Sequence, residues 1–147
     1  MVSTDDNGPE STPSGLAPEL LCQIRSECAQ LVATAFWLGD SREDEAYALC
    51  FTPDGMLDRA GDVMRGRQAL ALYVRQRPTT VTVRHFNSMP VMMIHNHRRI
   101  LSITLSTVYR WDADTVPTVV KAEVYDQCVL TEEGWRIAVR KAQPCGR

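Results

Sequence analysis

The stretch from Val119 to Ala142, VVKAEVYDQCVLTEEGWRIAVRKA, decides the fold of this chain. Its first half is rich in β-branched and apolar residues, and its second half alternates apolar and polar residues from Trp135 onward. Both patterns are typical of β-strands, and Gly134 fits a tight turn because glycine adopts a positive φ at little cost. We therefore predict an antiparallel hairpin with its turn at residues 131–134.

Alternation assigns the side chains of this hairpin to two faces. In the second strand one face holds Trp135, Ile137 and Val139, and the other holds Arg136, Ala138 and Arg140. In the first strand one face holds Val124, Asp126, Cys128 and Leu130. If this last set points inward, Asp126 is a single charge on an apolar wall. It must then stay protonated or find a buried partner, such as Arg136 or Arg140.

Length and composition indicate one globular domain. The chain has 147 residues, 44% of them hydrophobic and 23% charged, with a net charge of −2. This charge gives no reason to expect a nucleic-acid or membrane partner, and no apolar run reaches the ~20 residues of a membrane helix. Residues 1–17 are polar and predict a disordered tail without a secretory signal, followed by a domain over residues 18–147 and a cytoplasmic location.

Metal and disulfide chemistry are not expected. The five cysteines are odd in number, and no two of them have Cys-x-x-Cys spacing. His95 and His97 form a His-x-His pair in a predicted turn, but no third ligand accompanies them. No glycine-rich phosphate loop is present, so we expect no cofactor.

The remaining pattern predicts helices first and strands afterwards. Helical spacing starts at Pro18 and ends near Gly39, and a Ser41–Asp44 capping box precedes a short second helix. A turn at residues 52–55, a strand over 56–59, a loop between Gly61 and Gly66 and a helix over 67–76 follow. Four strands are then predicted, over residues 81–94, 100–111, 119–130 and 135–142. This order favours an α+β fold with helices on one face of a curved antiparallel sheet.

Four motifs then carry a resemblance to a known family. They are FTPDG at 51–55, the glycines that precede and open GRQAL at 61 and 66, VRHFNS at 83–88, and YDQCVLTEEGWRIAVR at 125–140. In order and spacing they resemble the SnoaL-like branch of the nuclear transport factor 2-like superfamily, which includes polyketide cyclases, scytalone dehydratase and ketosteroid isomerase. The resemblance implies a cone, in which three N-terminal helices close the curved sheet around a deep apolar pocket.

His85 and Asp40 are the first candidates for chemistry. Histidine titrates near neutral pH and can act as a general acid or base. By resemblance, His85 matches a pocket histidine of scytalone dehydratase-like proteins, and Asp40 matches an aspartate that orients it. The sequence departs from that pattern at Gly39, where a tyrosine is expected, and in the strand over 100–111, which has no second histidine. Tyr109 is the only tyrosine in that strand.

Asp58 and Asp126 are a rival pair. By resemblance, Asp58 lies where ketosteroid isomerase has its general base, and Asp126 lies near its oxyanion-stabilising acid. The tyrosine that completes such a site is missing from the first helix. The expected wall of the pocket is completed by Phe36, Met56, Asn87 and Tyr109.

Two functions remain open at this point. The first is a cofactor-independent dehydratase, cyclase or isomerase that acts on a small apolar, aromatic or polycyclic molecule through His85 and Asp40. The second is a non-catalytic small-molecule-binding or assembly subunit that resembles the β subunit of aromatic ring-hydroxylating dioxygenases. In either case we expect a homo-oligomer, a dimer or a trimer, because the open sheet face of this fold is usually covered by a neighbour.

Overall fold

The computed structural model describes residues 15–145, so most of the tail predicted over residues 1–17 lies outside the described residues. The helices are α1 (Pro18–Asp40), α2 (Asp44–Leu49) and α3 (Arg67–Arg75). The strands are β1 (Phe51–Arg59), β2 (Asp62–Arg65), β3 (Thr82–Asn87), β4 (Val91–Asn96), β5 (Arg99–Trp111), β6 (Thr118–Thr131) and β7 (Gly134–Pro144). Among the described residues, no helix has both the length and the apolar character needed to cross a membrane.

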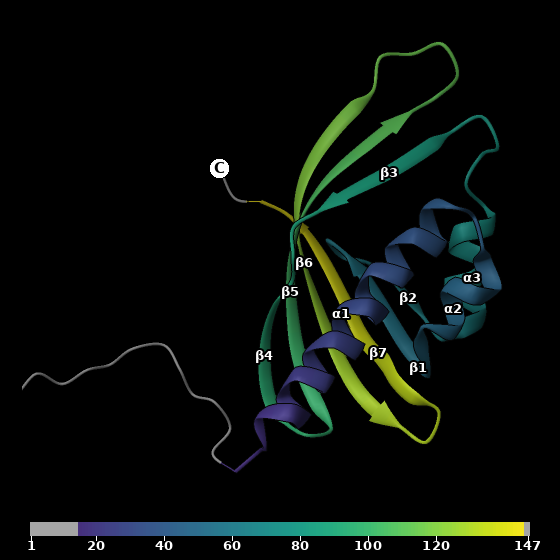
Figure 1. Cartoon of the computed structure of the whole chain (residues 1–147). Helices are drawn as coiled ribbons and strands as arrows, with labels where there is room; N and C mark the ends of the chain where they lie inside the picture. Colours follow the sequence, from purple (N-terminus) through teal and green to yellow (C-terminus); the bar gives the residue numbers. More distant parts are fainter. Residues whose placement is uncertain (1–14, 146–147) are drawn as a thin grey trace, which may run out of the picture.

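The strands form one curved sheet, and the helices cover its concave face (Figure 1). The strand order is β2-β1-β7-β6-β5-β3, and β4 pairs with the same edge of β5 as β3 does. The predicted α+β fold class is confirmed. The sheet is mixed rather than wholly antiparallel, because β1 pairs with β7 in the parallel direction. The sheet does not close on itself, which leaves the concave side accessible from one end.

The hairpin from which the fold was predicted is present. Thr131 pairs with Gly134 across the turn, and Gly134 has a φ of 98°. The Thr131 hydroxyl donates to the Gly134 carbonyl oxygen at 2.7 Å, which closes the turn. The hairpin therefore forms locally, in the place that glycine and alternation predict.

The strand predicted over residues 81–94 is two strands. β3 pairs with the C-terminal half of β5, with Asn87 opposite Ser106, and β4 pairs with the N-terminal half, with Val91 opposite Ile103. The chain leaves the ladder between them at Pro90. Proline has no N–H to donate to a neighbouring strand, so the edge breaks at that residue.

The turn predicted at residues 52–55 is wrong, because β1 runs through it. The pairing of β1 with β7 is irregular between Phe51 and Met56, so this segment is a bulge inside a strand. Gly55 permits the bulge, since a Cβ at this position would lie 2.7 Å from Phe51 Cβ. The loop predicted between Gly61 and Gly66 is also wrong, because β2 lies there and forms a hairpin with β1.

The capping box predicted from Ser41 to Asp44 is absent. Ser41 caps the C-terminus of α1, and the N-cap of α2 is Glu43, whose side chain makes no capping hydrogen bond. Arg42 turns the chain instead, with a φ of 63°. Its guanidinium donates to the carbonyl oxygens of residues 77, 78 and 81, so a tertiary contact fixes this corner.

The core lies between α1 and the concave face of the sheet. The buried stripe of α1 consists of Leu21, Ile24, Cys28, Val32, Ala35 and Phe36. The stripe packs against inward side chains of β5, β6 and β7, including Ile100, Cys128 and Ile137. The helical spacing of these residues explains why the first helix was predictable from the sequence.

Candidate active site

A cavity of about 490 Å³ lies between the concave face of the sheet and the helices. Its wall is mainly apolar and comes from α1, β1, β3, β5 and β6 through Phe36, Leu57, Val83, Val108 and Val124. Exposed residues at the strand ends, such as those at positions 59, 110 and 144, form its rim. A cavity of this size and character is usual for the binding of a small molecule.

His85 and Asp40 meet at the wall of this cavity. His85 Nδ1 lies 2.7 Å from Asp40 Oδ1, and the backbone N–H of His85 donates to Asp40 Oδ2 at 2.8 Å. Both carboxylate oxygens therefore hold the same residue, which fixes the plane and the direction of the imidazole. The Asp40 side chain is 9% exposed and the His85 side chain 25% exposed. The pair is thus partly shielded from water, and it is in contact with the cavity.

Phe36 lies against His85 on the predicted wall. The two ring centroids are 5.1 Å apart, with an angle of 43° between the planes. The guanidinium carbon of Arg140 lies 4.1 Å from the centroid of the same phenyl ring, a cation–π arrangement. The Phe36 ring therefore contacts both His85 and Arg140.

Asp126 is fully buried and has the partner that the sequence required. Arg140 Nε donates to Asp126 Oδ1 at 2.7 Å, and Arg140 Nη2 donates to Asp126 Oδ2 at 2.9 Å. Burial opposes the charge on Arg140, but the attraction and the hydrogen bonds of Asp126 outweigh it and raise the pKa of Arg140. Arg140 lines the cavity, whereas Asp126 lies behind it. Asp126 is therefore an ion-pair partner rather than a wall residue.

The face predicted for Arg140 is wrong, because β7 contains a bulge. Cys128 pairs with Ile137 and Gln127 pairs with Val139, so Ala138 is the extra residue of β7. Beyond it the alternation reverses, as expected at a bulge. Arg140 thereby points inward, opposite Asp126, and Val139 leaves the apolar face.

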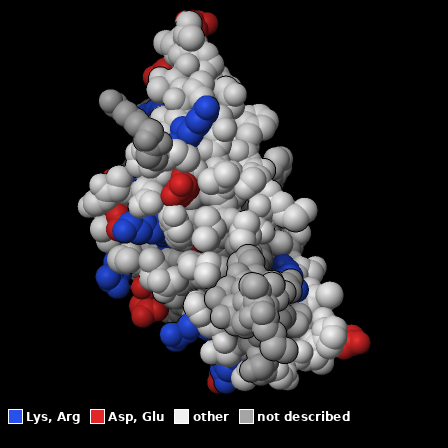
Figure 2. All heavy atoms as spheres, turned by 90° about the vertical axis from the view of Figure 1, so that its left-hand side faces the viewer, with Lys and Arg blue, Asp and Glu red and all other residues white. Residues whose placement is uncertain are grey.

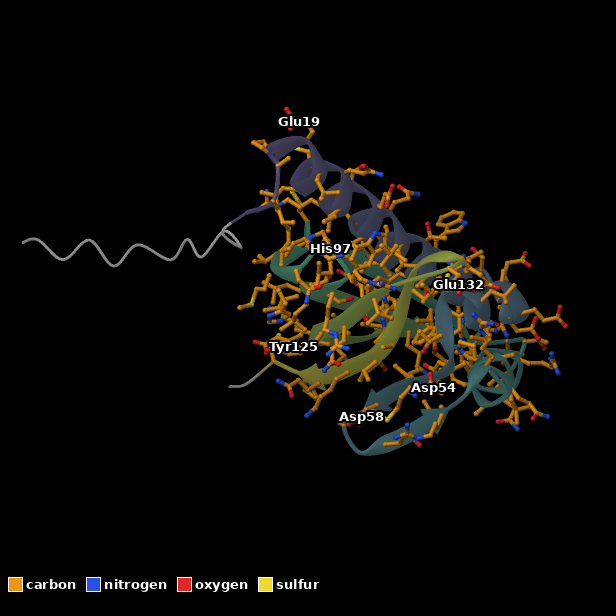
Figure 3. The ribbon with its side chains drawn as sticks, turned by 90° about the horizontal axis from the view of Figure 1, so that it is seen from below. Glu19, Asp54, Asp58, His97, Tyr125 and Glu132 are labelled. Atoms are coloured by element: carbon orange, nitrogen blue, oxygen red, sulfur yellow. The ribbon has the colours of Figure 1, made fainter. Side chains whose placement is uncertain are left out.

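Met56 and Asp58 do not line the cavity. They alternate with Leu57, which does, so they occupy the opposite face of β1. Met56 Sδ accepts from Arg65 Nη2 at 3.2 Å, and Asp58 Oδ1 accepts from the backbone N–H of Gly61 at 2.8 Å. Figure 3 shows Asp58 beside the turn into β2, where it caps the turn. The isomerase-like pairing of Asp58 with Asp126 is therefore absent from this cavity.

Asn87 and Tyr109 are also outside the cavity. Asn87 is exposed at the end of β3, beyond the reach of the helices. Tyr109 lies on the convex face of β5, where its ring meets Phe86 edge-on at a centroid distance of 5.4 Å. In β5 the even-numbered residues face inward and include Val108, so an odd-numbered tyrosine points outward.

Several cavity residues were not predicted from the sequence. They are the tyrosines at positions 47 and 73 and the arginines at positions 59, 77, 110 and 140. Burial raises the pKa of Tyr47, so its hydroxyl stays protonated at physiological pH and can donate a hydrogen bond. Arg110 could have been predicted from the alternation of β5, because it is two residues from Val108 and therefore lies on the same, inward face. Tyr47 could not be predicted in this way, because α2 has only six residues and is too short for its sequence pattern to show which side is buried.

The described residues offer no metal site. Within residues 15–145, no three side chains of His, Cys, Asp or Glu converge in a way that could hold a metal ion. His97 lies in the turn between β4 and β5, far along the chain from Asp40 (Figure 3). The ionisable side chains of the cavity are one imidazole, one carboxylate, two phenols and four guanidiniums, beside the amides of Gln76 and Gln143 and the hydroxyl of Thr118.

Comparison with solved structures finds the same architecture in several proteins. A scytalone dehydratase-like protein from Novosphingobium aromaticivorans is similar with a TM-score of 0.81 and 13% identity, covering 88% of this chain and 89% of that one. A ketosteroid isomerase-like protein from Erwinia carotovora atroseptica has a TM-score of 0.74 and 14% identity, covering 90% of this chain and 100% of that one. ActVI-ORFA from Streptomyces coelicolor has a TM-score of 0.72 and 17% identity, covering 83% and 97%. At these identities the likeness concerns the fold alone.

Sequence comparison gives the family. No curated protein sequence matches this chain significantly. The model of the SnoaL-like domain matches residues 22–141, which include most of α1, the whole of α2 and α3, and almost the whole sheet. The chain therefore belongs to the family of SnoaL-like domains.

Proposed function

We propose that this protein is a cofactor-independent lyase or isomerase that moves protons on a small, apolar, cyclic or aromatic molecule. The observation that carries the proposal is the contact of 2.7 Å between His85 Nδ1 and Asp40 Oδ1 at the wall of the cavity. A histidine held by a carboxylate, beside a space of about 490 Å³ for a ligand, is the arrangement that general acid–base catalysis needs.

The carboxylate assigns the roles of the two ring nitrogens. Nδ1 faces Asp40 and carries the ring proton, with which it donates a hydrogen bond to the carboxylate. The lone pair of the neutral ring is then on Nε2. Within residues 15–145, no hydrogen bond to Nε2 is present. His85 can therefore take a proton from a carbon next to a carbonyl group, and Asp40 stabilises the imidazolium that forms. Returning the proton to a leaving hydroxyl completes a dehydration, and returning it to another carbon completes an isomerisation.

Tyr47 supports the same chemistry from the floor of the cavity. Removal of a proton next to a carbonyl places negative charge on the carbonyl oxygen, and a hydrogen-bond donor lowers the barrier by stabilising that charge. Tyr47 is buried and lines the cavity, and its hydroxyl remains a donor because burial raises its pKa. No metal or cofactor is required for any of these steps.

The alternative, a non-catalytic subunit, accounts for less of this geometry. A binding or assembly module needs an apolar cavity but no imidazole oriented by a carboxylate at its wall. The His85–Asp40 pair is partly desolvated, and ordering two polar side chains in an apolar region costs free energy. The acid–base function explains why the pair is present.

Hydrogen exchange on a model ketone tests the proposal without knowledge of the natural substrate. 2-Tetralone in D₂O exchanges its C1 protons through an enolate, and proton NMR measures the rate. We expect the protein to accelerate exchange, and His85→Asn to reduce the protein-dependent rate by about 10²-fold or more, as for other general bases. Asp40→Asn should reduce it by about tenfold, because the imidazolium loses its counter-charge.

His97→Asn is the matched control, since His97 is exposed in a turn outside the cavity. Its exchange rate should equal that of the wild type. Exchange that is no faster than in buffer, or equal rates for the wild type and His85→Asn, would refute the proposed chemistry. Thermal unfolding of each variant shows whether a lost rate reflects a lost fold.

A further inference from the structure

The wall of the cavity carries an excess of positive charge. Four arginines line it, at positions 59, 77, 110 and 140, against one carboxylate, that of Asp40. Asp126 neutralises Arg140 through two hydrogen bonds, and Asp40 is bound to His85. Asp40 attracts Arg77 from a distance, but among the described residues no carboxylate forms an ion pair with Arg59, Arg77 or Arg110.

Arg77 is the most unusual of these groups. It follows α3, and Nη2 donates to the Gly39 carbonyl oxygen at 3.0 Å. Nη1 is buried and has no hydrogen-bond partner among the described residues. A buried guanidinium nitrogen without an acceptor costs free energy, which an anion at this place would recover. Nη2 holds Arg77 in place, and Nη1 lacks an acceptor among the described residues.

Arg110 adds a second positive charge to the part of the rim that contains Arg77. It ends the inward row of β5, opposite Val83 of β3 and Thr118 of β6, and its side chain is exposed at the cavity. Burial lowers the pKa of Arg77, and repulsion from Arg110 contributes to that shift, so the two guanidiniums lie close enough to interact. The charge of Arg110 also acts on Asp112, but this carboxylate is exposed and accepts hydrogen bonds from Thr80 and from the backbone N–H of Ala113.

We infer that Arg77 and Arg110 form a subsite for the carboxylate of the ligand, so that the molecule bound in this cavity is a cyclic or aromatic carboxylic acid. The inference rests on the proposed function and gives its substrate class. The carboxylate binds to the two guanidiniums at the rim, the ring system fills the apolar middle, and the reacting carbon lies toward His85. Guanidinium and carboxylate are planar and match in a two-bond arrangement, which a neutral ligand cannot supply.

Calorimetric titration of a matched pair of probes tests the subsite. 2-Naphthoate and methyl 2-naphthoate have the same rings and differ in charge at the group that should meet the arginines. We expect the acid to bind at least tenfold more tightly than the ester at low ionic strength, and this preference to shrink in 0.5 M NaCl because salt screens exposed charges. Equal affinities, or no binding of either probe, would overturn the inference.

Variants locate the subsite. Arg110→Gln removes an exposed guanidinium that makes no hydrogen bond within residues 15–145, so its fold should be intact. We expect it to weaken naphthoate binding about tenfold and to leave ester binding unchanged, and Arg77→Gln to do the same. Arg99→Gln is the control, since Arg99 is exposed at the opposite end of β5. If Arg110→Gln and Arg99→Gln bind naphthoate equally, the subsite is not where we place it.

The two proposals fail separately. Naphthoate binding involves no proton transfer, and ketone exchange needs no carboxylate. Loss of exchange with intact preference for the acid would remove the proposed catalysis and leave the subsite. Exchange that depends on His85, without any preference for the acid, would remove the subsite and leave the catalysis.

Discussion

The ion pair between Asp126 and Arg140 is the most buried one among the described residues. The two side chains are 0% and 4% exposed and share two hydrogen bonds. Desolvation of two charges is costly, so the pair need not add much net stability as a unit. Each partner alone, however, would be a buried charge without compensation. The pair therefore fixes the register of β6 against β7 at the floor of the cavity.

Asp126→Asn should destabilise the protein by about 3–5 kcal/mol, because it leaves the Arg140 guanidinium buried without its counter-charge. Urea unfolding followed by tryptophan fluorescence measures the change. Glu133→Gln is the control: its ion pair with Arg136 spans 3.8 Å, the glutamate side chain is 70% exposed, and such pairs contribute about 0–1 kcal/mol. Similar losses in the two variants would contradict the role assigned to the buried pair.

Burial also separates the cysteines by their expected reactivity. Cys22 is exposed, whereas Cys28, Cys50 and Cys128 are buried. Burial raises the pKa of the Cys50 thiol, and a hydrogen bond with Cys28 together with burial raises that of Cys128. A raised pKa means that less reactive thiolate is present at pH 8.

With Ellman's reagent at pH 8, we expect Cys22 to react within the first minutes and the three buried thiols to stay protected. All five cysteines should react in 6 M guanidinium chloride. Cys22→Ser should remove the contribution of Cys22 to the rapid phase and leave only that of the partly exposed Cys145. Rapid reaction of three or more thiols without denaturant would mean that α1 opens readily from the sheet.

At the scale of the elements, two bulges shape the site. The bulge in β7 reverses the alternation between Ile137 and Arg140 and brings the arginine inside. The irregular segment of β1 allows the strand to start with Phe51 against Ile137 and to continue with Leu57 against Arg140. Both strands thereby curve around the cavity, as bulged strands do.

Gly55→Ala tests the bulge of β1. An added Cβ would lie 2.7 Å from Phe51 Cβ and 2.9 Å from the Thr52 carbonyl oxygen. The backbone would have to shift, so we expect a loss of about 1–3 kcal/mol in the free energy of unfolding. Pro53→Ala, at an exposed position of the same segment, should change it by less than about 0.5 kcal/mol. Equal stability of the wild type and Gly55→Ala would show that the bulge relaxes freely.

At the scale of the whole molecule, the convex face of the sheet has no covering helix (Figure 1). Its exposed apolar side chains come from β3, β4, β5 and β6 and include Phe86, Val91, Met93, Leu105 and Val119. Figure 2 shows a broad uncharged area on this side of the molecule, with the charged side chains gathered mostly along one edge. Exposed apolar patches of this kind mark interaction surfaces.

We propose that a second copy of the chain covers this face. Lys121 and Glu123 are successive residues of the outward row of β6. They pair with Thr107 and Leu105 of β5, respectively. In a two-fold arrangement each lysine can meet the glutamate of the other copy, which makes the patch self-complementary. Of the dimer and the trimer expected from the sequence, this proposal favours the dimer.

Leu105→Glu should dissociate the dimer, because it places a charge in the middle of the apolar face, where Leu105 is 55% exposed. Light scattering after size exclusion should give about twice 16.5 kDa for the wild type and 16.5 kDa for the variant. Leu72→Glu, at a 44% exposed position of α3 away from the sheet, should remain dimeric. A monomeric wild type, or an unchanged mass for Leu105→Glu, would refute the interface.

The sequence by itself determined the elements whose signals are local. The period of α1, the β6–β7 hairpin with Gly134 at its turn, and the shared face of Val124, Asp126 and Cys128 are all set by neighbours along the chain. The family resemblance added the cone and the pairing of His85 with Asp40, two residues that the chain separates by 45 positions. Short periodic patterns and turn residues act before any tertiary contact, which is why these features could be predicted.

The tertiary structure alone decided which side chains share the cavity. Alternation assigned Arg140 outward, and only the pairing of β7 with β6 shows the bulge that turns it inward. Met56 and Tyr109 alternate with Leu57 and Val108, and only the packing of the helices on the sheet shows which of the two faces is the cavity wall. Tyr47 and Arg77 enter it through the packing of α2 and α3. Register, bulges and curvature arise from contacts between distant strands, so the sequence pattern of one strand cannot specify them.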